Sequence, residues 1–150
     1  MNNISHTLNL SLSLVFIVLF CGASCEKDTL NGIKKGELNS DIELSINDKV
    51  LINNEFVIDL TSIIDSRCPA DVQCVWAGNA STQFKIIGSN ESDLVINLCL
   101  GQCDTKFKTT DTTEFIRNNI RYSILLKEVT PYPKEGTSAD KKAVFIISKI

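Results

Sequence analysis

Between Asp41 and the C-terminus, hydrophobic and polar side chains alternate with a period of two. A period of two places successive side chains on opposite faces of an extended strand, one face against a core and the other in water. In the last run, Val144 and Ile146 define the expected core face. The pattern therefore predicts half-buried β-strands in the runs 42–46, 56–60, 84–86, 94–98, 122–126 and 144–150.

Short polar segments rich in Asn, Gly and Pro separate these runs, and such segments are typical of turns. They are Asn47-Asp48, Asn53-Asn54, 88–93, Asn118-Asn119 and 131–136. About seven to nine short strands spaced in this way predict an all-β domain. We expect an antiparallel β-sandwich of immunoglobulin-like or Greek-key type, with a small β-barrel as the alternative.

One segment is ambiguous in its secondary structure. Asp111 and Glu114 have the spacing of a helix capping box, so 111–118 is the one candidate helix of the chain. A strand or a turn is equally compatible with these residues.

The N-terminal segment has the pattern of a secretory signal peptide. Residues 8–20 are almost wholly apolar, yet this run is shorter than the roughly 20 residues that a membrane-spanning helix needs. Three small residues, Gly22-Ala23-Ser24, follow it. We therefore expect residues 1–24 to be a signal peptide, although the segment before the apolar run lacks Lys and Arg. An uncleaved anchor is the alternative.

Cys25 directly follows a small residue, which is where a lipoprotein carries its acylated cysteine. The run Ser24-Cys25-Glu26-Lys27-Asp28 resembles the cleavage sites of Bacteroidetes-type lipoproteins. The resemblance implies lipidation at Cys25 and attachment to a membrane of the cell envelope; the alternative is plain secretion with a free thiol. Residues 25–40 are polar and aperiodic, which predicts a flexible tether before a domain at 41–150.

Charge and composition exclude several function classes. The net charge is −3 and no basic cluster is present, which argues against nucleic-acid binding. The only histidine, His6, lies in the predicted signal peptide. Catalysis by a histidine base and histidine-ligated metal sites are therefore not expected in the mature chain. We predict no catalytic residues, no metal and no cofactor, although Ser-Lys or paired-carboxylate chemistry stays formally open.

Cys21 lies in the predicted signal peptide, and the cysteines after Cys25 form an even set, which in an exported chain predicts disulfides. Their spacings, five and three intervening residues, differ from the Cys-x-x-Cys pairs of zinc and redox sites. Proximity in sequence favours two short-range bonds, and a crossed pairing that joins the two segments is the alternative. The four residues are Cys68, Cys74, Cys99 and Cys103.

Four side chains are candidates for a binding surface, because Arg and aromatic residues are favoured anchors of interfaces. Three of them, Arg67, Trp76 and Asn79, lie in the stretch 65–80, which also holds Cys68 and Cys74. The fourth is Tyr132, in a Pro-Tyr-Pro segment.

Structural roles for the stretch 65–80 are the favoured interpretation. Arg67 can pair with Asp65 or Asp71. We expect Trp76 to pack on a disulfide or in the core, as large aromatics in sandwiches do. Gly78 permits a bulge or a left-handed turn before the next strand.

The motif Asp65-Ser-Arg-Cys-Pro, followed by Val72-x-Cys74-x-Trp76-Ala-Gly78-x-Ala80, resembles the signature of a family of small exported bacterial proteins. A later Pro131-Tyr132-Pro133 segment also matches, and the resemblance covers roughly residues 41–150. Members of the family are often lipoproteins, which the resemblance also implies here. The family has no assigned activity, so no functional residue can be transferred.

These observations together predict an envelope-anchored lipoprotein that acts as a non-catalytic binding module for a protein or glycan partner. The alternative is a structural or accessory envelope lipoprotein without a dedicated ligand. The sequence does not indicate an oligomeric state.

Overall fold

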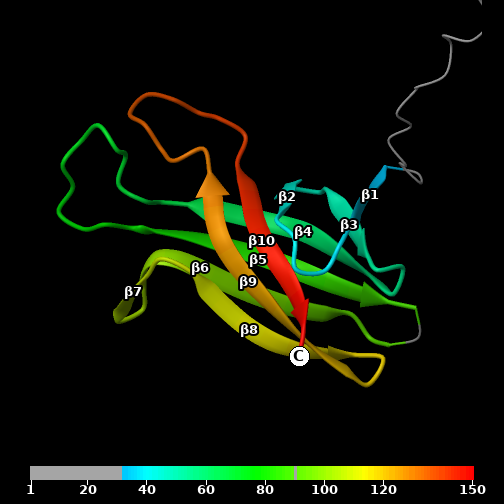
Figure 1. The fold of residues 1–150 in the computed structure, drawn as a ribbon. Helices are drawn as coiled ribbons and strands as arrows, with labels where there is room; N and C mark the ends of the chain where they lie inside the picture. Colours follow the sequence, from blue (N-terminus) through cyan, green and yellow to red (C-terminus); the bar gives the residue numbers. More distant parts are fainter. Residues whose placement is uncertain (1–31, 90) are drawn as a thin grey trace, which may run out of the picture.

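The computed structural model describes residues 32–89 and 91–150, which form ten β-strands in two packed sheets (Figure 1). The six-stranded sheet has the order β1-β3-β4-β5-β6-β7, and the four-stranded sheet has the order β2-β10-β9-β8. The strands are β1 (Ile33–Gly36), β2 (Ile42–Ser45), β3 (Lys49–Ile52), β4 (Phe56–Asp65), β5 (Asn79–Gly88), β6 (Leu94–Cys103), β7 (Lys106–Lys108), β8 (Asp111–Arg117), β9 (Ile120–Thr130) and β10 (Lys142–Lys149).

The predicted β-sandwich is confirmed, and the two sheets do not close into a barrel. All neighbouring strands are antiparallel except β1 and β3, which are parallel. The strand number exceeds the expected seven to nine because β1, β3 and β7 have only three or four residues each. These three strands, unlike β2, show no sustained alternation from which they could be recognised.

The core lies between the two sheets and is built by the inward residues of the alternating runs. Leu44, Ile58, Phe84 and Ile124 are fully buried, as their alternation predicted. The last strand differs, because Ala143, Phe145 and Ile147 face the core instead of Val144 and Ile146. The run 144–147 is apolar at every position, so its pattern could not decide which face is buried.

The predicted Asn turns are present. Asn53 and Asn54 between β3 and β4, and Asn118 and Asn119 between β8 and β9, all have positive φ. Asn tolerates this left-handed backbone, which tight turns between antiparallel strands require. The ambiguous segment is also decided, since Asp111–Arg117 forms β8 and pairs with β9 along its whole length.

The folded domain begins earlier than residue 41. The predicted signal peptide, Cys25 and the first part of the predicted tether lie outside the described residues. Ile33–Gly36, within the expected tether, forms β1 and pairs in parallel with β3. A Cβ at Gly36 would lie 2.7 Å from a side-chain atom of Val50, so glycine lets this edge strand approach the core.

Candidate functional site

Two long loops and a short hairpin meet at one end of the sandwich (Figure 1). We call this region, formed by residues 66–78, β7 and residues 131–141, the loop end. The two loops are joined by backbone contacts, because the amide of Ala70 donates to the carbonyl of Pro133 at 3.0 Å. The amide of Glu135 also donates to the Asp71 carboxylate at 2.9 Å. The loops are therefore held to each other as well as to the sheets.

Two disulfides brace the loop end, and both have the short-range pairing that proximity favoured. Cys68 and Cys74 close the first loop, with their Cα atoms 5.9 Å apart. Cys99 and Cys103 close the end of β6, with their Cα atoms 6.0 Å apart. The crossed alternative is wrong. Because disulfides persist in oxidising compartments, the two bonds indicate an exported environment.

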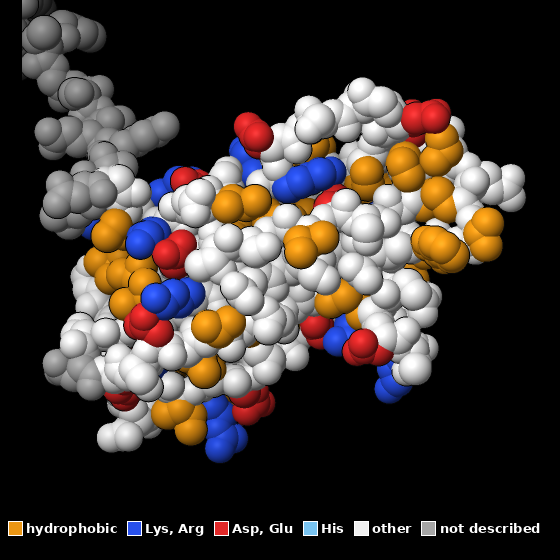
Figure 2. Space-filling model, turned by 180° about the vertical axis from the view of Figure 1, so that it is seen from behind, with side chains coloured by type: hydrophobic (Ala, Val, Ile, Leu, Met, Phe, Trp, Pro, Cys, Tyr) orange, Lys and Arg blue, Asp and Glu red, His pale blue; other side chains and the backbone are white. Residues whose placement is uncertain are grey.

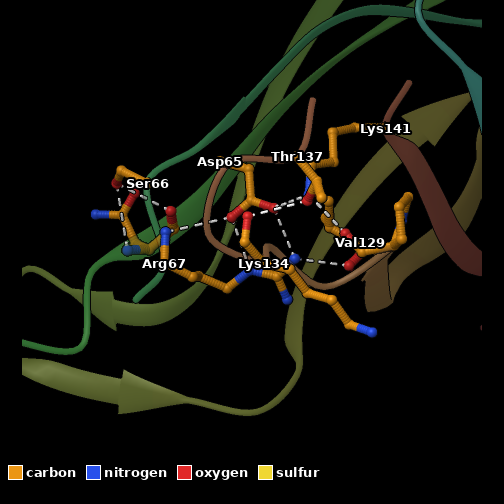
Figure 3. Close-up of polar contacts among 9 residues, drawn as sticks. Asp65, Ser66, Arg67, Val129, Lys134, Thr137 and Lys141 are labelled. Carbon is orange, nitrogen blue, oxygen red and sulfur yellow. Dashed lines mark hydrogen bonds and ion pairs between the residues drawn. The ribbon is translucent and has the colours of Figure 1, made fainter. Parts of the chain in front are cut away.

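Arg67 is a buried organising residue of the loop end (Figure 3). Its Nε and Nη2 atoms each donate to the Asp65 carboxylate at 2.8 Å. Nη2 also donates to the carbonyl of Val129, at 2.7 Å, so the side chain ties the first loop to the end of β9. Of the two possible partners, Arg67 therefore pairs with Asp65, and Asp71 binds the second loop instead.

Asp65 is buried against two cations. Lys141 approaches Asp65 Oδ2 at 3.0 Å and also donates to the carbonyl of Pro131 at 2.6 Å. Burial disfavours the ionised carboxylate, but the hydrogen bonds from Arg67 and Lys141 outweigh this effect and hold the pKa of Asp65 below its usual value. The cluster therefore holds two cations around one buried carboxylate.

Tyr132 lies against the Arg67 cluster from the second loop. The Arg67 guanidinium carbon lies 4.3 Å from the centroid of the Tyr132 ring, a distance typical of a cation–π contact. Half of the Tyr132 surface stays exposed. The ring is thus held in place by a fixed guanidinium and is still presented to solvent.

Two glycines allow the backbone of the loop end to pack closely. Gly78 has a φ of 67°, and a Cβ there would lie only 1.9 Å from the carbonyl oxygen of Ser66. Gly101 has a φ of 89°, and a Cβ there would lie 2.6 Å from the carbonyl oxygen of Gly78. The predicted left-handed turn at Gly78 is confirmed. Asn79 is a structural residue, since its side-chain amide donates to the carbonyl of Gln102 at 3.2 Å.

Trp76 is not a core residue. It is 76% exposed, and its neighbour Val75 is 98% exposed, so the expectation that Trp76 is buried in the core or on a disulfide is wrong. In the first loop, the amide of Cys68 donates to the carbonyl of Ala77 at 2.8 Å. The loop projects beyond the sheets (Figure 1). The inner faces of the strands already fill the core without Trp76.

Exposed aromatic side chains gather at the loop end. The described part of the chain has three exposed aromatics, Trp76, Phe107 and Tyr132, and all three belong to this end. Figure 2, which views the molecule from behind, shows hydrophobic side chains clustered there. The remaining described aromatic residues are buried, namely Phe56, Phe84, Phe115, Tyr122 and Phe145.

A pocket of about 210 Å³ opens between Phe107 and Tyr132. Its lining includes Arg67 and the two glycines, Gly78 and Gly101, at which backbone packs closely on backbone. Sequence reasoning missed Phe107, because a lone aromatic in a three-residue strand carries no pattern. Arg67 and Tyr132, which it did select, line the same pocket, whereas Trp76 and Asn79 are not among the lining residues.

Two absences hold across residues 32–89 and 91–150, the part of the chain that the structure describes. No group of three or more His, Cys, Asp or Glu side chains in that part could hold a metal ion. No helix there is long and apolar enough to cross a membrane.

Comparison with known proteins gives no match, whether with family models, with curated proteins or with solved structures.

Proposed function

We propose that this protein is a non-catalytic binding module that presents its loop end to a protein or glycan partner at the cell envelope. The observation that carries the proposal is the gathering of Trp76, Phe107 and Tyr132 at one end of the sandwich. Exposed aromatic side chains on a rigid support are favoured binding anchors, because they offer large contact areas and lose little conformational entropy on binding.

The rigidity of the support favours binding over a purely structural role. Two disulfides, the buried Arg67–Asp65 pair and the hydrogen bonds between the loops hold the loop end before any partner arrives. A surface ordered in advance does not lose that entropy on association. Exposed aromatic side chains carry an aggregation risk, so their concentration at one end of the sandwich supports a role in binding.

Export and lipid anchoring form the second part of the proposal. The apolar segment 8–20, the small residues before Cys25 and the cysteine itself support a lipid-anchored protein. The disulfides are consistent with that location. A polar segment between Cys25 and the first strand would then separate the loop end from the membrane surface.

A retention experiment tests the binding function. The full chain, carrying Cys25→Ser so that no lipid contributes, is incubated with delipidated envelope of the bacterium that produces it. We expect retention that is lost in Trp76→Ala and Tyr132→Ala and kept in Ile116→Ala, since Ile116 is 61% exposed on β8, outside the loop end.

Circular dichroism and thermal melting establish that each variant is folded. If folded Trp76→Ala and Tyr132→Ala proteins are retained as well as the parent, the binding function is wrong. If the parent itself is not retained, the chain is an accessory envelope protein without a dedicated ligand.

A further inference from the structure

The pocket at the loop end combines two exposed aromatic side chains with a lining that includes two glycines. Phe107 is 63% exposed and Tyr132 is 50% exposed, and both line the pocket. The two glycines are Gly78 and Gly101, where backbone approaches backbone. The volume of about 210 Å³ lies below the range of drug-sized sites, so the pocket suits one small ring or one side chain rather than an extended ligand.

Each cation of the pocket lining contacts a carboxylate. Arg67 pairs with Asp65, and Lys108 donates to Asp111 at 2.8 Å. Lys127 contacts both carboxylate oxygens of Asp41, at 2.7 and 2.8 Å. An anionic ligand would therefore have to compete with these carboxylates, which disfavours a phosphate or an acidic polymer.

The polar groups of the lining that lack a partner are acceptors and hydroxyls. Within the described part of the chain, no hydrogen bond engages the Glu128 carboxylate or the hydroxyls of Thr109 and Tyr132. Glu128 and Thr109 are exposed, so their polar atoms are accessible to a ligand. A carboxylate accepts hydrogen bonds at two oxygens, and a hydroxyl both donates and accepts. This set suits a ligand rich in hydroxyl groups.

From this arrangement we infer that the pocket binds one ring of a neutral saccharide, packed between Phe107 and Tyr132. The inference rests on the proposed binding function and names its ligand class. The C–H face of a sugar ring is apolar and packs on an aromatic face, while its equatorial hydroxyls point outward. In this pocket those hydroxyls donate to Glu128 and exchange hydrogen bonds with Thr109. The Arg67 guanidinium lies against the Tyr132 ring, 4.3 Å from its centroid, and restrains its orientation.

A larger groove on the outer face of the six-stranded sheet is a weaker candidate. It measures about 530 Å³ and its lining includes the side chains of Gln83 and Asn97. Gln83 donates to Asn97 at 3.2 Å and accepts from Thr61 at 3.1 Å, so these amides satisfy each other. The lining contains no aromatic residue. This groove provides the control position for the test.

The test measures retention of the Cys25→Ser full chain on delipidated envelope after two treatments. Periodate cleaves the vicinal diols of saccharides, and protease removes polypeptide. We expect periodate to abolish retention and protease to leave most of it. In a competition arm, the uncharged oligosaccharides of an envelope hydrolysate, separated by anion exchange, should displace the protein, and the anionic fraction should not.

Variants locate the saccharide in the pocket. Phe107→Ala, Tyr132→Ala and Glu128→Gln should each weaken binding of the neutral fraction by roughly tenfold, which corresponds to about 1.4 kcal/mol. Gln83→Ala in the outer groove and Glu114→Gln on β8 are matched controls and should bind as the parent does.

Three outcomes overturn the inference: retention that survives periodate, displacement by the anionic fraction alone, or equal binding by the pocket variants and the controls. Retention that survives periodate but needs Trp76 and Tyr132 leaves the binding function intact and makes the ligand a protein. Absence of retention for the parent protein removes the binding function and the saccharide together.

Discussion

The Arg67 guanidinium lies 4.3 Å from the centroid of the Tyr132 ring, although the two residues come from different loops. Arg67 is buried because its charge is matched by Asp65 and its Nη2 atom binds the carbonyl of Val129. Tyr132 is half exposed because only one side of it meets this cluster. A buried ion pair thus acts as the support of a presented aromatic ring, and this links the stability of the loop end to its binding surface.

Replacing Arg67 with Ala should destabilise the protein by roughly 3 kcal/mol, because it leaves the buried Asp65 with Lys141 as its remaining cation. Urea unfolding measures the change. Arg121→Ala is the matched control, since Arg121 is 61% exposed in its side chain and should change the free energy of unfolding by less than about 1 kcal/mol. Equal changes in the free energy of unfolding for the two variants would show that the buried Arg67–Asp65 pair stabilises the protein no more than an exposed arginine does.

Trp76→Ala should leave the stability within about 0.5 kcal/mol of the parent, because the side chain is 76% exposed and outside the core. Phe84→Ala, at a fully buried position, should cost about 3–5 kcal/mol. Thermal melting of both variants checks the contrast. A large loss of stability in Trp76→Ala would mean that the tryptophan is structural after all.

Removing the first disulfide by Cys68→Ser with Cys74→Ser should lower stability by about 2 kcal/mol, the value expected for a loop this short on the chain-entropy model. Retention on envelope should fall further than stability alone explains, since the loop carries Trp76. Assays well below the melting temperature separate the two effects. Full retention by a folded double variant would show that the disulfide does not order the binding surface.

Acid should destabilise the protein through Asp65. The folded pKa of this carboxyl is lower than its unfolded value of about 4, so its ionised form stabilises the fold above about pH 4. That contribution is lost as the pH falls through the lowered folded pKa. The free energy of unfolding measured from pH 6 to pH 2 should fall more steeply for the parent than for Asp65→Asn. Parallel curves would contradict the assignment.

The raised pKa of Tyr122 predicts a second pH dependence of stability, at alkaline pH. Burial, and then its hydrogen bond to Glu55, raise the pKa of Tyr122 to about 12, above the unfolded value of about 10. The neutral hydroxyl therefore stabilises the fold fully below pH 10, and this contribution is lost as the pH rises towards 12. Tyr122→Phe should lack that loss while keeping loop-end binding, because Tyr122 lies at the opposite end of β9 from Val129. Identical alkaline unfolding of the parent and Tyr122→Phe would contradict this prediction.

Much of the fold could be predicted from local pattern. The alternation of Leu44, Ile58, Phe84 and Ile124 with polar neighbours identified their strands, because the period of two is a property of the extended chain itself. The pairs Asn53-Asn54 and Asn118-Asn119 identified turns for the same reason. The pattern failed in two ways. The strands β1, β3 and β7 are short and show no sustained alternation. In β10, every position of 144–147 is apolar, so the buried face could not be assigned.

The candidate site was predicted less well than the strands. The favoured structural role of Arg67 is confirmed by its pair with Asp65, whereas Trp76 was expected inside and is exposed. Charge and size are poor guides to burial within a loop. Burial there depends on which other segment arrives with a matching group, as Asp65 and the Val129 carbonyl do for Arg67.

By itself, the sequence determined the all-β class of the domain and the positions of most strands and turns, and it favoured a short-range disulfide pattern. Each of these follows from the pattern of residues close in the chain. Only the tertiary structure decided that Arg67 supports Tyr132, that Phe107 joins them and that Trp76 stays outside the core. Those relations depend on how the ends of β4, β6 and β9 meet in space, because packing between distant segments selects which side chains are covered and which are presented.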